Sequence, residues 1–217
     1  MILQFFGHSC FKISSQNRRT LITDPYPKEI GLRPPRSSCD IVTVSHNHWD
    51  HNAYQNLGGD FKLVDLPGEY EIKGIFIKGI ESFHDNKKGK ERGLNTIFNI
   101  LVEDIWVCHL GDLGQSQLSE EQLSLIGDVD ILLIPVGGVY TIGPKEAKKI
   151  IHQIEPEIII PMHYWLPSLK IQELEKVEKF FKEMGLKPSQ EEKLVVKKNE
   201  VSQKQMEVVW LKELGKS

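Results

Sequence analysis

The chain has 217 residues, of which 40% are hydrophobic and 26% are charged, so a single domain with one large core is expected over residues 1–217. Its formal net charge of −3 gives no basic excess, which disfavours a protein whose main work is to hold nucleic acid through phosphate contacts. Its apolar runs are far shorter than the roughly 20 residues that span a bilayer, and the start of the chain lacks the basic lead of a signal peptide. The sequence therefore predicts a cytoplasmic protein with no membrane segment.

The first half of the chain is rich in short strands that polar turns separate. The first three of these, bounded by Gly7 and by the turn at 15–19, predict a meander of antiparallel strands. Strands are predicted at 2–6, 10–14, 20–23, 40–45, 61–66, 70–72, 75–80, 95–102 and 105–109.

The second half mixes helices with strands. Ser119 and Gln122 form a capping-box pattern at the start of the first helix. Two β-branched runs flank the second helix, which predicts a βαβ unit, and the third helix places Leu174 and Phe181 on one apolar stripe. Helices are predicted at 120–126, 144–154 and 170–184, and strands at 131–135, 158–161, 194–196 and 206–211.

This order of elements predicts the layers of the fold. Mixed strands followed by interleaved helices favour an α/β architecture in which two sheets pack face to face and helices cover both outer surfaces. The predicted fold is thus a four-layer αββα sandwich.

Three cysteines, Cys10, Cys39 and Cys108, stand at wide and unpatterned spacings. An odd number with such spacing fits neither a disulfide framework nor a structural zinc ribbon. They are predicted to be reduced packing residues.

Residues 45–51 read Ser-His-Asn-His-Trp-Asp-His and follow a predicted strand. In extended backbone, residues two apart point the same way, so His46 and His48 can reach one metal, while the turn after them lets Asp50 and His51 face a neighbouring position. The segment therefore predicts two adjacent metals. The competing interpretation, a solvated loop, requires three histidines to cluster in six positions by chance.

Further ligands are expected from segments that also follow predicted strands, namely from His84, Asp112 and His163. Because open α/β sheets place ligand sites beyond the carboxyl ends of their strands, one site can collect these side chains. Imidazole and carboxylate ligands without thiolate suit zinc, manganese or iron, and the pattern does not choose among them.

Other residues near these segments have two interpretations. His8 is either a pocket residue or a packing residue, and Asp85 is a possible competitor of His84 for the metal. Arg92 and Asn95 either bind an anionic substrate or stabilise a strand edge. For His109, support of Asp112 is favoured over direct ligation.

The motif His46-x-His48-x-Asp50-His51 resembles the signature of the metallo-β-lactamase fold superfamily of metal-dependent hydrolases. The opening Gly7-His8-Ser9 and the small size are similar to its lactonase-like branch, which includes ascorbate-6-phosphate lactonase. The resemblance extends over nearly the whole chain, through Thr23-Asp24-Pro25, His84, the stretch from His109 to Asp112, and Pro161-Met162-His163.

The resemblance implies a dinuclear metal centre. Where the commonest zinc β-lactamases supply a cysteine ligand, this chain has Asp112, so antibiotic hydrolysis is not expected as its native role. By resemblance the first metal would be held by His46, His48 and His84, and the second by Asp50, His51 and His163, with Asp112 as a bridge and Asp24 as an orienting group.

The sequence thus predicts a metal-dependent hydrolase that acts on a small-molecule ester, lactone or phosphoester. Two divalent ions, zinc or manganese with iron as an alternative, would activate water as the nucleophile, and Asp50 would take up a proton as the tetrahedral species collapses. Three alternatives stay open: a phosphodiesterase or nuclease of the same superfamily, an iron-dependent redox enzyme, and a non-catalytic metal-binding protein. The number of subunits is not predicted.

Overall fold

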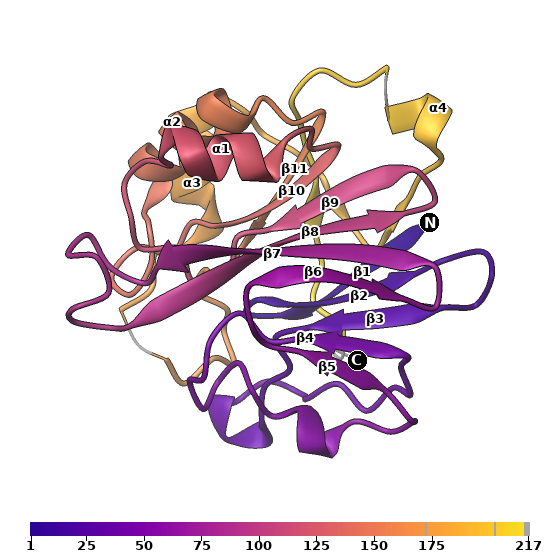
Figure 1. Cartoon of the computed structure of the whole chain (residues 1–217). Coiled ribbons are helices and arrows are strands. Elements are labelled where there is room, and N and C mark those ends of the chain that lie inside the picture. The colour runs from indigo at the N-terminus through magenta and orange to yellow at the C-terminus, as the bar shows by residue number, and fades with distance from the viewer. Residues whose placement is uncertain (172, 202, 215–217) are drawn as a thin grey trace.

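The computed structural model describes residues 1–171, 173–201 and 203–214 and contains two β-sheets that face each other (Figure 1). The first sheet has six strands in the order β13-β1-β2-β3-β4-β5. Its strands are β1 (Ile2–Gly7), β2 (Cys10–Ser14), β3 (Thr20–Thr23), β4 (Ile41–Thr43), β5 (Lys62–Val64) and β13 (Leu194–Val195). The first three are antiparallel, which confirms the predicted meander, whereas β3, β4 and β5 are parallel.

The second sheet has seven strands in the order β14-β11-β10-β9-β8-β7-β6. From β6 to β9 each strand is antiparallel to the one before it, whereas β9, β10, β11 and β14 are parallel to one another. Its strands are β6 (Gly68–Ile72), β7 (Ile75–Phe83), β8 (Leu94–Val102), β9 (Ile105–His109), β10 (Ile131–Pro135), β11 (Ile158–Met162) and β14 (Glu207–Val208).

Helices cover the sheets unevenly. The helices α1 (Glu120–Ile126), α2 (Pro144–Ile154) and α3 (Val177–Met184) gather on the side of the seven-stranded sheet, and α4 (Lys198–Val201) lies near the C-terminus (Figure 1). On the side of the six-stranded sheet lie loops and two 3₁₀ turns, η1 (Lys28–Ile30) and η2 (Tyr54–Asn56). The α/β sandwich of two facing mixed sheets is as predicted, although the outer surface of the six-stranded sheet carries 3₁₀ turns where α-helices were predicted. Within the described residues, no helix has the length and apolar character needed to cross a membrane.

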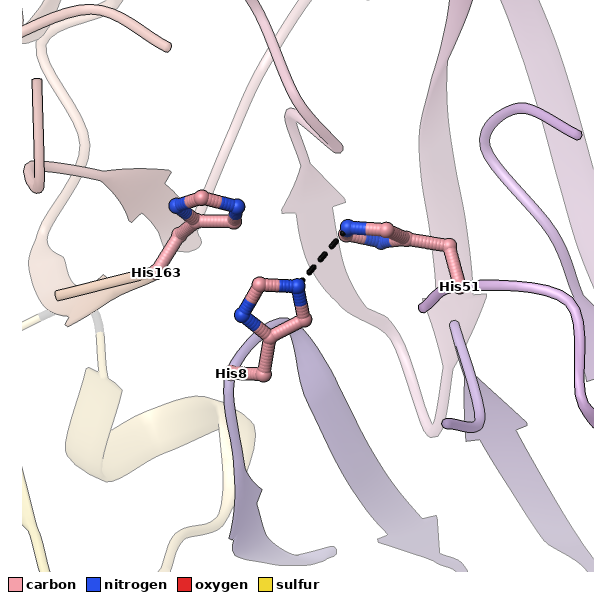
Figure 2. Close-up of side chains that lie close together, drawn as sticks. All are labelled: His8, His51 and His163. Atoms are coloured by element: carbon pink, nitrogen blue, oxygen red, sulfur yellow. Dashed lines mark hydrogen bonds between the residues drawn. The ribbon is translucent and has the colours of Figure 1, made fainter. Parts of the chain in front are cut away.

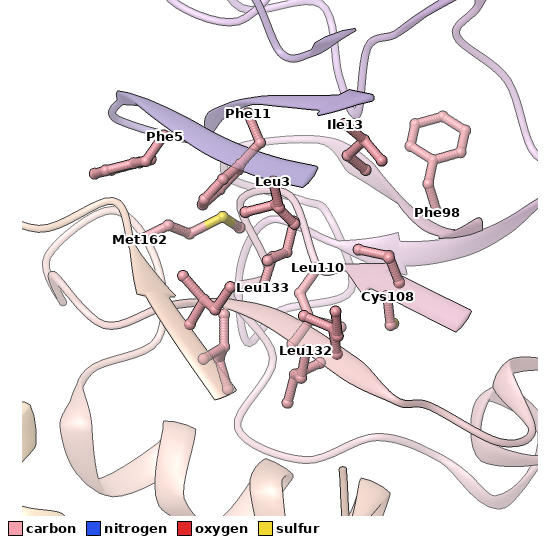
Figure 3. Close-up of a cluster of buried hydrophobic side chains, with 14 of the residues drawn as sticks. Leu3, Phe5, Phe11, Ile13, Phe98, Cys108, Leu110, Leu132, Leu133 and Met162 are labelled. Atoms are coloured by element: carbon pink, nitrogen blue, oxygen red, sulfur yellow. The ribbon is translucent and has the colours of Figure 1, made fainter. Parts of the chain in front are cut away.

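The core lies between the sheets, where side chains of β1 and β2 meet those of β8 to β11 (Figure 3). The rings of Phe5 and Phe11 pack in a tilted arrangement with centroids 4.8 Å apart, and both are fully buried. Cys108 lies in the same cluster, and all three cysteines are unpaired and buried, as predicted. Removal of this apolar surface from water fixes the two sheets against each other and so fixes their loops at one edge.

Local sequence signals were accurate where the chain folds by local contacts. Ser119 Oγ accepts a hydrogen bond from the backbone N–H of Gln122, and Gln122 Oε1 accepts one from the N–H of Ser119, so the capping box of α1 is confirmed. The βαβ unit is confirmed as well, because β10 and β11 pair in parallel across α2.

The predicted helix over 170–184 is too long, since α3 begins only at Val177. The segment before it is held in non-helical form by tertiary hydrogen bonds: Glu175 donates its N–H to Gly137, and Trp165 donates its N–H to Glu175. Residue 172 lies outside the described residues. The apolar stripe is otherwise correct, because Phe181 is only 6% exposed.

The predicted strand over 206–211 is in fact two short strands that serve different sheets. The first, β14, extends the seven-stranded sheet beside β11, whereas β15 (Trp210–Leu211) pairs with β12 (Gln190–Glu191). A continuous apolar pattern therefore hides a change of pairing partner.

Candidate metal centre

The polar side chains of the site all follow the carboxyl ends of strands. In the first sheet β1, β3 and β4 run in the same direction, and in the second sheet β7, β9 and β11 do. Their carboxyl ends meet at one edge of the sandwich, where such sheets bind ligands. The residues that follow these ends are His8 after β1, Asp24 after β3, the motif 46–51 after β4, His84 after β7, Asp112 after β9 and His163 after β11.

Asp112 lies at the centre of the cluster. Its Oδ2 atom is 3.2 Å from His163 Nε2, 3.3 Å from His51 Nε2, 3.4 Å from His84 Nε2 and 3.9 Å from His46 Nε2. The residue is only 2% exposed. One carboxylate oxygen thus faces four imidazoles that come from both sheets.

Three histidines on one side of Asp112 form a first triad: His46, His48 and His84. One nitrogen of each lies within 4.8 Å of the others. His46 Nδ1 is 2.9 Å from Ser45 Oγ, while His46 Nε2 is buried without a hydrogen-bond partner. A buried ring nitrogen left unpaired beside two other imidazoles is the arrangement that a metal ligand adopts.

On the other side of Asp112, His8, His51 and His163 form a second triad, again with ligand atoms within 4.8 Å of one another (Figure 2). His8 Nε2 is 2.9 Å from His51 Nε2 and 3.2 Å from Asp50 Oδ2. Asp50 Oδ2 is also 3.8 Å from His51 Nε2. All seven predicted ligands are therefore together, and the fully buried His8 packs against His51 and His163.

Asp24 holds the segment 45–51 in place through hydrogen bonds to both of its ends. Its carboxylate accepts hydrogen bonds from the Ser45 N–H (2.7 Å) and the Ser45 hydroxyl (2.6 Å), and His51 Nδ1 lies 3.0 Å away. With Nδ1 occupied by this contact, Nε2 of His51 is directed into the cluster. These contacts fit the orienting role expected of Asp24.

The backbone of the site is strained at three of its residues. His8, Asp24 and His163 have φ angles of 56°, 39° and 51°, in the left-handed region that residues other than glycine rarely adopt. The His163 N–H donates to the His8 carbonyl oxygen at 2.8 Å, which joins loops of the two sheets. Such strain collects at functional sites, where the surrounding structure holds it.

The cluster carries an excess of negative charge. Burial alone raises the pKa of a carboxyl, yet the imidazoles of His163 and His51 hold the pKa of Asp112 well below its usual range, and those around Asp24 lower its pKa too. The pKa of Asp50 is likewise low because of its hydrogen bond to an imidazole. Burial lowers the pKa of His51, but Asp112 and Asp24 raise it far more. Two buried carboxylates, Asp24 and Asp112, together with the partly exposed Asp50, give the cluster negative charge that suits divalent cations.

Acidification should destabilise the metal-free protein. Burial lowers the pKa of His46 to about 2 and that of His8 to about 4, from 6.5 in the unfolded chain. Below pH 6.5 these two histidines therefore bind protons in the unfolded chain but stay neutral in the folded chain. Their contribution to the free energy of unfolding is complete above pH 6.5 and is lost as the pH falls. At pH 4.5 the loss is about 2 to 3 kcal/mol for each histidine.

The test is a set of urea unfolding curves of chelator-treated protein between pH 7 and pH 4.5. His51 opposes the trend only near pH 7, because its pKa is raised in the folded chain, and below about pH 6 it is protonated in both states. The carboxylates stay ionised in this window, which lies above the ordinary aspartate value of 3.8. A midpoint that stays constant or rises on acidification would contradict the burial of these two imidazoles.

His109 and Asn95, whose roles the sequence left open, support the loop that carries Asp112. His109 Nε2 lies 2.9 Å from the Ser9 carbonyl oxygen and its Nδ1 accepts the Gly111 N–H, so it supports the loop before Asp112 rather than the carboxylate itself. Asn95 accepts the Asp112 N–H at 2.9 Å and is 1% exposed, so its buried side chain positions this loop.

Asp85 does not compete for a metal. Its two oxygens accept the backbone N–H groups of Lys87, Gly89, Glu91 and Arg92 at 2.7 to 2.9 Å. These hydrogen bonds lower the pKa of Asp85 to about 2, although burial opposes the shift. The carboxylate thus organises the loop that follows His84.

A cavity of about 600 Å³ opens over the cluster. Its inner wall is formed by His48, Asp50, His84, Asp112 and His163. Its other lining residues include Trp49 and Tyr140, and also Arg92 and Lys170. Sequence reasoning missed Lys170, because that residue was placed at the start of a helix that in the structure begins only at Val177, and no local signal links it to a motif more than 100 residues earlier.

Comparison with known proteins gives consistent matches. Residues 2–163 match the model of a family described as a beta-lactamase superfamily domain. A UPF0173 metal-dependent hydrolase of Staphylothermus marinus is 32% identical over 200 residues, which cover 75% of this chain and 83% of that protein.

Two solved structures are similar to this chain. A proposed zinc-dependent hydrolase of the metallo-beta-lactamase superfamily from Thermotoga maritima has a TM-score of 0.80 and 37% identity over 97% of both chains. Igni18, a metallo hydrolase from Ignicoccus hospitalis, shares the fold with a TM-score of 0.63 and 19% identity, over 99% of this chain and 96% of that one.

Proposed function

Because the chain belongs to the UPF0173 family of the metallo-β-lactamase superfamily, we propose that it is a hydrolase with a two-metal centre that acts on small-molecule esters, lactones or phosphoesters. The position of Asp112 carries the proposal. Its Oδ2 atom lies between the two histidine triads and within 3.9 Å of an imidazole nitrogen on each side. A carboxylate in that position can bridge two cations.

The donors divide into two sets. The unpartnered Nε2 atom of His46 and the negative charge of the cluster both support occupation by cations. All donors are imidazole or carboxylate, so zinc, manganese and iron are the candidates. We assign the first metal to His46, His48 and His84, and the second to Asp50, His51 and His163, with Asp112 shared between them.

Two such cations would lower the pKa of a bound water to about 7 and thereby supply the nucleophile. The described residues that line the cavity include no serine, threonine or cysteine, which supports water in that role. Asp50 lines the cavity with a side chain that is 14% exposed, and its hydrogen bond to His8 fixes the carboxylate. Asp50 can therefore accept a proton from the reacting centre and pass it on.

Metal removal should abolish the activity. The natively purified protein would first be analysed for bound metals and then assayed on lactones, aryl esters and phosphodiesters. Dialysis against a chelator should lower the rate on the best substrate by at least about 100-fold. The cations would both activate the attacking water and polarise the substrate oxygen, and both effects are lost with them. Addition of zinc, manganese or ferrous iron, one at a time, should restore it.

Two results would contradict the proposal. If the fully metal-free protein retained its activity, the cations would not take part in the reaction. If the metal-loaded protein hydrolysed no member of the panel, the cluster would belong to a non-catalytic metal-binding protein.

A further inference from the structure

The cavity is lined by two cationic side chains in addition to the residues of the metal-binding cluster. Arg92 and Lys170 both line it, and so does Glu91. Glu91 is paired with Lys87 at 2.5 Å, which offsets its charge. Within the described chain, no carboxylate lies within ion-pair distance of Arg92 or Lys170. The cavity therefore offers two positive charges that the protein itself does not neutralise.

The Arg92 side chain is held in position before any ligand arrives. The four backbone hydrogen bonds to Asp85 fix the loop from Lys87 to Arg92. The Arg92 guanidinium then lies over the Tyr140 ring, 5.5 Å from its centroid. A cation that is fixed in this way loses little conformational entropy when it binds an anion.

Lys170 is anchored through its backbone. Its N–H donates to the Ile30 carbonyl oxygen at 2.8 Å, which ties the segment before α3 to the loop at η1. Apolar surface is also present in the cavity, where Tyr140 and Ile171 line it together with Trp49, which is 56% exposed. The cavity thus combines a catalytic wall, apolar contacts and two cations.

From this arrangement we propose that the substrate is an ester, lactone or phosphoester that carries a second anionic group, a carboxylate or a phosphate, which Arg92 and Lys170 bind. This inference rests on the proposed function and specifies its substrate class. Arg92 offers a planar pair of N–H donors that matches either anion, and Lys170 adds a point charge. The apolar residues would contact the body of the substrate.

The test uses esters that differ only in the terminal group. Mono-4-nitrophenyl glutarate and 4-nitrophenyl valerate have acyl chains of equal carbon length, but only the glutarate carries a charge. A phosphonate-terminated ester forms a third arm that separates carboxylate from phosphate recognition. For the metal-loaded wild type, kcat/KM should be at least about 10-fold higher for a charged ester than for the valerate.

Variants then assign this preference to residues. Arg92→Gln and Lys170→Gln should each reduce the ratio, mainly through KM for the charged ester, and the double variant should bring it to about 1. Asp85→Asn should act in the same direction, because it loosens the Arg92 loop. Lys149→Gln, an exposed lysine on α2, is the matched control and should keep the ratio.

A binding measurement separates this inference from the proposed hydrolysis. The corresponding 4-nitroanilides keep the shape of the esters and resist cleavage, and their dissociation constants can be measured by equilibrium dialysis. Tighter binding of the charged anilide that is lost in the double variant supports the inference even if no ester is cleaved. Equal affinities for charged and neutral probes, or a preference that survives in the double variant, would overturn it.

Discussion

Exchange of Asp112 for asparagine is expected to lower kcat/KM by at least about 1,000-fold on any substrate that the wild type hydrolyses. The amide keeps the size of the side chain but loses the charge, so it cannot hold two cations at a fixed distance. The carboxylate oxygen that it replaces lies within 3.4 Å of three imidazoles. Bound metal should accordingly fall from two ions per chain to one or fewer.

Stability has to be measured beside activity. Asp112 raises the pKa of His51, so loss of the carboxylate also removes a partner of this buried imidazolium. Thermal melting with and without added metal shows whether the activity loss exceeds the loss of folded protein. His152→Ala, an exposed position on α2, is the control and should change neither quantity. Near-normal turnover and full metal content in Asp112→Asn would contradict the shared role of Asp112.

Exchange of Asp24 for asparagine is the second large effect that we expect. The variant places an amide where three donors, the Ser45 N–H, the Ser45 hydroxyl and His51, meet a fully buried carboxylate. The free energy of unfolding should fall by about 3 kcal/mol, because hydrogen bonds to a charged acceptor are lost. The affinity for the second metal should fall by about 10 to 100-fold, since His51 is no longer oriented.

Asp130→Asn is a matched control for this variant. Asp130 is also buried, accepts the Trp106 N–H at 2.8 Å and pairs with Lys198 at 2.7 Å, but it lies before β10, at the opposite end of the strand from the site. Its exchange should reduce stability without a change in metal affinity, which isothermal titration calorimetry would measure. If Asp24→Asn behaved in the same way as Asp130→Asn, Asp24 would be a stabilising residue without an orienting role.

The composition of the cluster could be predicted because one topological rule governs it. Residues that follow parallel strands meet at one edge, so His46, Asp112 and His163 could be grouped before any distance was known. The rule needs only the positions of the strands along the chain, and the hydrophobic pattern predicts these accurately. His8 also follows a strand, but it stands alone in a short turn, and nothing in its neighbourhood separates a pocket residue from a packing residue.

Residues placed by tertiary contacts were not predictable. The chain around Lys170 has the composition of a helix, yet hydrogen bonds from Lys170 to Ile30 and from Glu175 to Gly137 hold these two residues outside the helix. Asp85 stands next to His84 and was a reasonable candidate ligand, but four N–H groups of its own loop occupy its oxygens. Local hydrogen bonding of an aspartate competes with any other use of its carboxylate.

The most direct test of the two-metal centre is an anomalous difference map from crystals of the natively purified protein, recorded at the absorption edge of the metal found by elemental analysis. We expect two peaks in the cluster, each about 2.0 to 2.2 Å from its ligand atoms. One peak should lie among His46, His48 and His84, the other beside His51 and His163, and both should contact Asp112. A single peak, or peaks only outside the cluster, would contradict the account.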